Sequence, residues 1–183
     1  SQNRIAGTLR QNVEQLKLAA ALYIFGEGVP FVYYGEEIGM NGGKPDEQIR
    51  SPMVWAEGKK DRNQTTWEES KYNKNTVPVK AQEKDQASLL QYYKRLIRIK
   101  TAHPALFSGR FKAVDTGNPA VSSWTMSCPT EKAIVINNLA ATETTVKIPA
   151  GYDMPEIFDG SPAVKNIAGE LTLPPYCTVV LAK

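Results

Sequence analysis

The sequence predicts an α+β protein in which a helix, strand, long loop and helix precede an antiparallel β-sandwich. Two helical patterns lie in the first hundred residues, at residues 9–24 and 85–101, with one short apolar run between them. From residue 104 on, the chain changes to short strand-like runs that are separated by turn residues at regular spacing. We therefore expect two domains, residues 1–103 and residues 104–183.

Residues 9–24 predict the first helix, because apolar side chains recur there at spacings of three and four: Leu9, Val13, Leu16, Ala20 and Ile24. Gly26 is expected to end the helix, and Pro30 prevents it from resuming. The apolar and aromatic run at residues 31–34 comes next, and it predicts a short buried strand. A helix that leads through a short turn into a buried strand is half of an α/β repeat.

Residues 41–84 have little periodicity and contain many Gly, Pro and charged residues. Loops longer than about 15 residues are uncommon in compact domains and are usually functional. We expect this segment to pack on the surface with Trp55, Trp67 and Tyr72 as anchors, because burial of rings offsets the entropy of ordering a loop. Stacking of the same rings against sugars is the alternative.

Residues 85–101 give the clearest helical pattern. Asp85 is a candidate cap, and His103-Pro104 ends the helix. One face carries Leu89, Tyr93, Leu96, Ile97 and Lys100. Seven strands are predicted after it, at residues 111–115, 121–128, 133–138, 144–148, 156–158, 170–173 and 177–181, with Trp124 in the core.

Composition excludes several classes of protein. Apolar residues make up 42% and charged residues 22%, which is typical of a folded domain and argues against disorder. The net charge of +3 comes from scattered basic residues, so nucleic acid is not an expected partner. No apolar run reaches the roughly 20 residues that cross a bilayer, and a membrane is not expected either. A disulfide between Cys128 and Cys177 and a pair of free thiols are both open alternatives. No metal site or cofactor motif is evident.

Several motifs resemble the alpha-amylase family of glycoside hydrolases (family 13 type). Gly28-Val-Pro-Phe-Val-Tyr-Tyr-Gly-Glu-Glu-Ile-Gly39 resembles its eighth barrel strand and the loop after that strand. Arg50-Ser-Pro-Met-Val-Trp55 is similar to its Arg-x-Pro-Met-x-Trp element. Residues 75–82, 88–97 and 103–106 resemble the final barrel helix and its exit, and residues 171–181 resemble the closing strands of its C-terminal domain. The resemblance covers most of the chain in the family's order.

The resemblance implies that residues 1–103 are part of a (β/α)8, or TIM, barrel: helix 7, strand 8, a long loop and helix 8. It also implies action on the α-glucosidic bonds of starch or maltooligosaccharides with retention of configuration, which requires two neighbouring carboxyl groups. In the family, these and a third carboxylate come from strands four, five and seven. Gln2-Asn3-Arg4 resembles the residues just after the family's strand-seven motif, and Ser1 stands where the aspartate of that motif would be. We therefore expect no catalytic residue in this chain and no activity from the chain alone; calcium would bind elsewhere in the full-length enzyme.

Three residues are candidates for substrate binding: Arg50, Tyr34 and Glu36. The guanidinium of Arg50 is a rigid donor fork that suits sugar hydroxyls or a carboxylate. The alternative is a surface arginine that packs on Trp55 or pairs with Asp46 or Glu47.

Glu36 and Glu37 are adjacent, and the alternative to a role at the site is one structural acceptor and one solvated charge. Tyr34 lies at the barrel mouth or in the core. A carbohydrate-binding module and a non-catalytic interaction protein are the competing functions. Because a barrel segment exposes strand edges and helix faces, we also predict self-association through residues 1–100.

Overall fold

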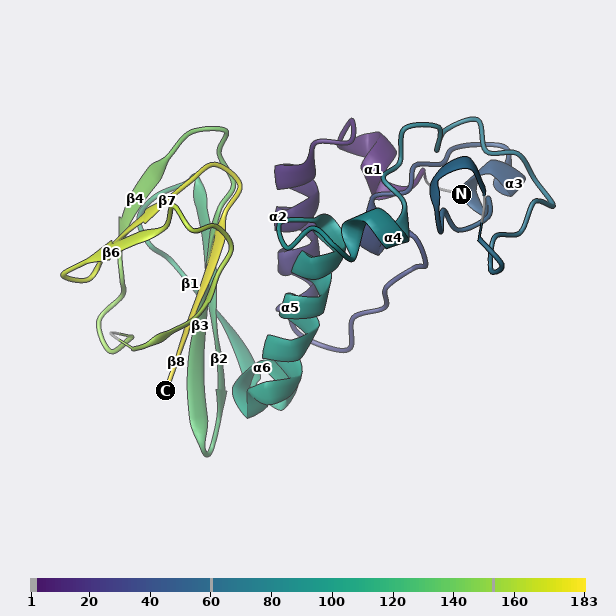
Figure 1. Ribbon diagram of the computed structural model, residues 1–183. Helices are drawn as coiled ribbons and strands as arrows, with labels where there is room; N and C mark the ends of the chain where they lie inside the picture. The colour runs from purple at the N-terminus through teal and green to yellow at the C-terminus, as the bar shows by residue number, and fades with distance from the viewer. Residues whose placement is uncertain (1–2, 60, 153) are drawn as a thin grey trace. The chain divides into compact units, whose positions relative to one another are not determined.

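The computed structural model describes residues 3–59, 61–152 and 154–183 (Figure 1). The described residues form two compact units, which are presented separately. The first comprises Ser1–Leu16 and Phe31–Lys94, and the second comprises Lys17–Pro30 and Arg95–Lys183. The expected domain boundary after residue 103 stays a prediction. No helix in the described part of the chain is both long enough and apolar enough to span a bilayer.

The first unit contains short helices joined by irregular segments: α1 (Ile5–Thr8), η1 (Glu36–Ile38), α3 (Asp46–Ile49), η2 (Glu57–Lys59) and α4 (Val79–Gln82), together with the beginnings of α2 (Val13–Ile24) and α5 (Leu89–Ala102). Its apolar cluster consists of Ile38, Met40, Val79 and Leu90, with Met53, Val54 and Trp55 packed against it. Backbone hydrogen bonds from Val79 and Lys80 to the carbonyls of Val54 and Trp55 hold the same region, at 3.0 and 3.1 Å.

The long segment is irregular, as predicted, but its aromatic residues differ in role. Trp55 packs on the apolar cluster and anchors the segment. Trp67 is 60% exposed, so the prediction that it is an anchor is wrong. Tyr72 is also exposed and donates only a long hydrogen bond, 3.4 Å, from its hydroxyl to the Lys44 carbonyl.

Helix α2 begins at Val13 rather than at the predicted residue 9. Arg10 and Gln11 have positive φ angles of 52° and 56°, which interrupt a helix. The side-chain oxygen of Asn12 then accepts a hydrogen bond from the Gln15 N–H at 3.0 Å and caps the new helix. The predicted end before Gly26 is correct.

Helix α5 begins at Leu89, and its cap is Ser88 rather than Asp85. The Ser88 hydroxyl accepts a hydrogen bond from the Gln91 N–H at 3.2 Å. The Asp85 carboxylate accepts one from the Ala87 N–H and stabilises the preceding turn. Of the residues predicted to share one face, Leu89, Tyr93, Leu96 and Lys100 are buried, whereas Ile97 is 45% exposed.

Residues 31–34 do not form the predicted buried strand. They are irregular backbone that leads into a turn, and Phe31 is 89% exposed. A buried strand needs neighbouring strands to satisfy its N–H and C=O groups. The described residues of the first unit include no strand, so residues 31–34 have none to pair with.

The second unit contains an antiparallel β-sandwich. One sheet has the order β1-β2-β3-β8-β5, from β1 (Arg110–Val114), β2 (Val121–Cys128), β3 (Glu131–Asn138), β8 (Thr178–Ala182) and β5 (Glu156–Asp159). The other has the order β4-β7-β6, from β4 (Thr144–Lys147), β7 (Glu170–Leu173) and β6 (Lys165–Ile167). Every predicted strand is present within two residues of its expected bounds. Strand β6 was missed because its three residues are all exposed and show no apolar alternation.

The sandwich core lies between the two sheets. It contains Ile134, Ile136, Val146, Met154, Leu171, Leu173, Val179 and Leu181. The opposite face of the larger sheet carries Trp124 and Phe158, both buried as core residues. There, Phe158 packs edge-on against Phe25 with ring centroids 5.4 Å apart, and Trp124 Nε1 donates to the Phe25 carbonyl at 3.2 Å. The chain just after α2 thus covers one face of this sheet.

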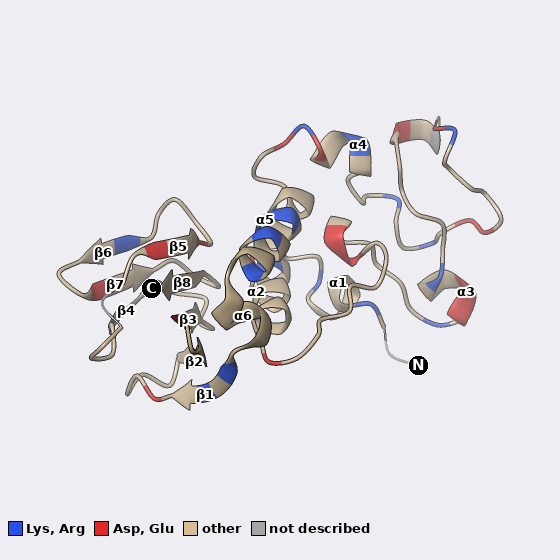
Figure 2. Cartoon of the chain, turned by 90° about the horizontal axis from the view of Figure 1, so that it is seen from below, with Lys and Arg blue, Asp and Glu red and all other residues tan. Residues whose placement is uncertain are grey.

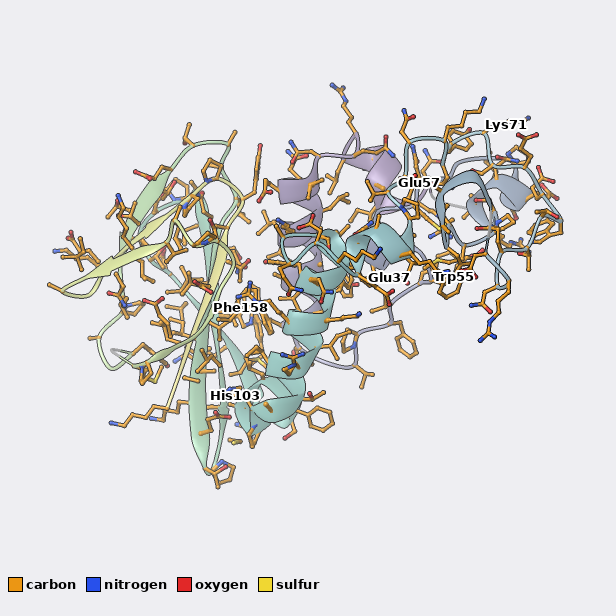
Figure 3. The ribbon with its side chains drawn as sticks, viewed as in Figure 1. Glu37, Trp55, Glu57, Lys71, His103 and Phe158 are labelled. Carbon is orange, nitrogen blue, oxygen red and sulfur yellow. The ribbon has the colours of Figure 1, made fainter. Side chains whose placement is uncertain are left out.

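A short helix, α6 (Pro104–Ser108), comes after His103 and was not predicted. The Glu131 carboxylate at the start of β3 accepts a hydrogen bond from the Ala105 N–H at 2.9 Å and contacts His103 Nδ1 at 2.6 Å. This carboxylate therefore connects the end of the helical segment to the sheet; Figure 3 labels His103 beside the sheet.

Cys128 and Cys177 are free thiols, so of the two alternatives left open, a disulfide and a pair of free thiols, the second is correct. Figure 2 shows Lys and Arg distributed over α4, α5, β1 and β6.

Candidate functional site

A buried arginine, Arg4, organises the region that holds the candidate residues. Its Nη1 donates to the Tyr34 carbonyl at 2.7 Å and to Glu36 Oε1 at 3.1 Å. Its Nε donates to the Ile49 carbonyl at 2.9 Å, and its backbone N–H donates to the Gly42 carbonyl at 2.9 Å. One residue therefore connects the start of the chain to three later segments.

The guanidinium of Arg4 also stacks on two tyrosine rings. Its central carbon lies 4.6 Å from the ring centroid of Tyr33 and 4.9 Å from that of Tyr34. Cation–π contacts strengthen as the cation loses water, and the Arg4 side chain is only 1% exposed. The resemblance of Gln2-Asn3-Arg4 to a family motif placed Arg4 in the chain but did not predict this role, because its contacts are to residues far away in the sequence.

Glycine at position 35 makes the turn that brings Glu36 to Arg4. Gly35 has φ of +87°, which disfavours any residue with a side chain. A Cβ built there would lie 2.5 Å from Met40 Sδ, so space also requires glycine. The 3₁₀ turn η1 begins at once and directs Glu36 inward.

Burial and charge act in opposite directions on the Glu36 carboxyl. Desolvation raises its pKa above the usual 4.5, and the Arg4 charge and hydrogen bond lower it, with a net rise. Burial also raises the pKa of the Tyr34 phenol. Arg4 Nη2, Glu36 Oε2 and Glu37 Oε2 are buried without a hydrogen-bond partner among the described residues. Both carboxylates therefore have acceptor capacity that the described chain does not use. Glu36 is a structural acceptor, as one of the two was expected to be, and Glu37 is half-buried.

Arg50 lies apart from the Arg4 cluster and points to solvent. Its side chain is 63% exposed, and Nη2 lies 3.1 Å from Asp46 Oδ2, one helical turn earlier. Asp46 also accepts from Lys44 Nζ at 2.7 Å. The structure therefore confirms the alternative in which Arg50 pairs with Asp46.

The backbone on both sides of Arg50 is nevertheless held by the cluster. The Ile49 carbonyl accepts from Arg4 Nε, and the Ser51 carbonyl accepts from the Tyr34 hydroxyl at 3.2 Å. The structure thus links the three predicted residues: Tyr34 and Glu36 contact Arg4 directly, and Arg50 extends from a backbone that Arg4 and Tyr34 fix.

Two buried amides that sequence reasoning also missed hold the rest of the long segment. Asn73 Nδ2 donates to the Asn41 carbonyl at 2.9 Å and to Ser51 Oγ at 3.1 Å, and its Oδ1 accepts from the Asn41 N–H at 2.7 Å. Gln48 Oε1 accepts from the Lys71 N–H at 2.7 Å. In an irregular segment, such amides cannot be told from solvated ones by sequence. The described residues contain no group of three or more His, Cys, Asp or Glu placed to hold a metal ion.

Comparison with known proteins identifies the family. Residues 1–109 match the model "Alpha amylase, catalytic domain", and residues 121–180 match "Alpha-amylase SusG C-terminal domain". The chain is 33% identical to Alpha-amylase 3 of Dictyoglomus thermophilum over 172 residues, which is 93% of this chain and 34% of that protein. It is also 33% identical to Alpha-amylase SusG of Bacteroides thetaiotaomicron over 150 residues, 77% of this chain and 22% of that protein.

Among solved structures, the alpha-amylase from H. orenii matches with a TM-score of 0.88 and 33% identity, over 100% of this chain and 38% of that one. The chain spans about a third of the length of Alpha-amylase 3 and somewhat more of the H. orenii structure. These likenesses confirm the predicted class, a partial barrel followed by a β-rich domain. The chain therefore belongs to the alpha-amylase family of glycoside hydrolases, of which it holds a C-terminal part.

Proposed function

We propose that this chain forms the closing β/α unit and C-terminal domain of a glycosidase that cleaves α-glucosidic bonds of starch-like glucans with retention. The observation that carries the proposal is that the Arg50 side chain is exposed while the backbone that bears it is held in place. Its guanidinium faces solvent, while Arg4 and Tyr34 hold the carbonyls on either side of it. A donor fork on a fixed backbone suits the hydroxyls of a sugar or a carboxylate of the same enzyme.

The residues have distinct roles in this proposal. Arg50 contacts substrate directly or through a carboxylate, whereas Tyr34 and Glu36 position its loop. Retention requires two carboxyl groups about 5–5.5 Å apart, one as nucleophile and one as acid/base. We assign no residue of this chain to either role, so we expect the isolated chain to release no reducing sugar from soluble starch.

The experiment that tests the function is a chimera. Residues 1–183 replace the matching C-terminal part of the H. orenii alpha-amylase, and the product is assayed on starch. We expect hydrolysis whose first product is the α-anomer by NMR. Arg50→Met should lower activity on starch and leave the free energy of unfolding unchanged within about 0.5 kcal/mol, because Arg50 and Asp46 form only an exposed pair.

Two outcomes would contradict the proposal. One is starch hydrolysis by the isolated chain. The other is a chimera that folds, as judged by circular dichroism and a cooperative melt, and retains full activity after Arg50→Met. Arg98→Met is the matched control, because Arg98 is exposed on α5 and should change neither quantity.

We also propose that the isolated chain self-associates through its first hundred residues. Phe31 is 89% exposed, and Val32, Tyr33 and Tyr34 are 39%, 44% and 40% exposed. Contiguous exposed apolar residues on irregular backbone favour pairing with another chain. Light scattering at micromolar concentration should give a dimer or larger species, and Phe31→Ser should shift it toward monomer. A monomer at every concentration tested would refute this expectation.

A further inference from the structure

The first unit contains a cavity that the Arg4 cluster does not line. It has a volume of about 480 Å³, within the range of about 300–1,000 Å³ that is typical of small-molecule sites. Its walls come from residues 52–58 and 64–78 of the long segment. Arg4, Tyr34, Glu36 and Arg50 are not among the residues that line it.

Buried and half-buried amides build these walls. Gln64 Nε2 donates to the Met53 carbonyl at 2.8 Å, and Gln64 Oε1 accepts from the Trp55 N–H at 3.1 Å. Asn73 Oδ1 also accepts from Thr76 Oγ1 at 2.9 Å. The amide groups of Gln64 and Asn73 are already hydrogen-bonded to the backbone and side chains around them. They therefore fix the shape of the cavity and are not available to bind a ligand.

The groups available to a ligand lie at the rim. Glu69, Lys74 and Asn75 are exposed, and their side chains make no hydrogen bond or ion pair within the part of the chain that the structure describes. The remaining lining includes the apolar side chains of Pro52 and Pro78, both buried. The cavity thus joins an apolar surface to free hydrogen-bonding groups; Figure 3 labels Glu57, another lining residue, and the neighbouring Trp55.

The charge of the lining selects among ligand classes. Three carboxylates, Glu57, Glu68 and Glu69, stand against one ammonium group, Lys74. This excess of negative charge disfavours phosphates and carboxylates. A neutral molecule with an apolar face and several hydroxyls fits both the wall and the rim, and a sugar ring has those properties.

We propose that this cavity is an accessory site for one glucosyl unit of an α-glucan, separate from the surface that carries Arg50. The identity of the sugar rests on the proposed function, whereas the cavity and its chemistry do not. Asn75 and Glu69 bind the hydroxyls, and the proline wall contacts the C–H face of the ring. The site holds a chain of the substrate and performs no chemistry.

Isothermal titration of the 183-residue chain with maltotriose tests the proposal. We expect saturable one-to-one binding with a dissociation constant on the order of 1 mM, as suits a site that offers a single sugar ring few hydrogen bonds. Asn75→Ala and Glu69→Ala should each weaken binding by about fivefold, the effect of one lost hydrogen bond. Arg50→Met and Arg98→Met should leave the affinity unchanged, and both rim residues are exposed, so folding should be preserved.

The outcomes separate the two proposals. Absence of saturable binding, or affinity unchanged in both rim variants, overturns the accessory site and leaves the activity of the chimera as an independent result. Weakening by Arg50→Met alone places the sugar on the Arg50 surface and likewise overturns this assignment. Rim-dependent binding by the chain together with a folded but inactive chimera supports the cavity and contradicts the proposed function.

Discussion

Replacing Arg4 with methionine is expected to destabilise the first unit by about 3–5 kcal/mol, the range for breaking one partner of a buried ion pair. The variant keeps a side chain of similar length but leaves the Glu36 carboxylate buried without its cation. It also removes the donors to the carbonyls of Tyr34 and Ile49. Urea unfolding followed by the fluorescence of Trp55 and Trp67, both in the first unit, measures the loss.

The loss of stability in Arg4→Met should increase with pH. Burial holds the pKa of Glu36 above its usual 4.5 in the folded chain, so this carboxyl favours folding most below that value, where it is protonated in both states. That contribution is lost as pH rises through the folded pKa. Without Arg4, which lowers it, the folded pKa rises further, and ionisation costs more. The difference between the two proteins should be larger at about pH 7.5 than at about pH 4.5.

Arg98→Met is the control for Arg4→Met, because it removes an exposed arginine and should change stability by less than about 0.5 kcal/mol at either pH. Hydrogen exchange adds a local test. Amides in residues 34–51 should exchange faster in Arg4→Met, because the carbonyls of Tyr34 and Ile49 lose their hydrogen bonds from Arg4. Equal stability of Arg4→Met and the original chain at neutral pH would show that the cluster does not hold the loop.

Leu171→Ala is expected to destabilise the β-sandwich by about 2–5 kcal/mol, through lost burial and the cavity left behind. Leu171 is fully buried on β7, between the two sheets of the core. Thermal unfolding monitored by Trp124, the tryptophan of the second unit, should show a lower midpoint.

Ile167→Ala on the adjacent strand β6 is the matched control. Ile167 is 70% exposed, and its removal should cost less than about 0.5 kcal/mol. Comparable destabilisation by the two substitutions would mean that the sandwich core lies elsewhere than between β7 and the larger sheet.

The sandwich was predictable from sequence because each of its longer strands has its partners within the same chain. Turn residues and apolar alternation placed β2 and β7 at their observed bounds. Residues 31–34 failed because the described residues of the first unit include no strand to pair with. Their composition suits a buried strand, but a strand exists only where neighbours complete its hydrogen bonds. Side chains such as Asn12 and Ser88, which cap helices, decided where α2 and α5 begin.

The candidate site was predictable only in part. Motif resemblance located Tyr34, Glu36 and Arg50, but it did not reveal that Arg4 connects them. A buried arginine acts through contacts to backbone carbonyls 30 and 45 positions away, and such contacts leave no mark on local sequence pattern. The pairing of Arg50 with Asp46 was anticipated as an alternative because the two are one helical turn apart.

The concentration of hydrogen bonds on Asn73 and Gln48 has an evolutionary consequence. Asn73 and Gln48 hold the long segment through hydrogen bonds to its own backbone, in addition to the contacts of Trp55 and Gln64. Substitutions at exposed positions that make no such contact, such as Lys74 and Asn75, should therefore leave the fold of the segment unchanged. A loop of this construction can accept point changes on its surface without insertions or a new fold.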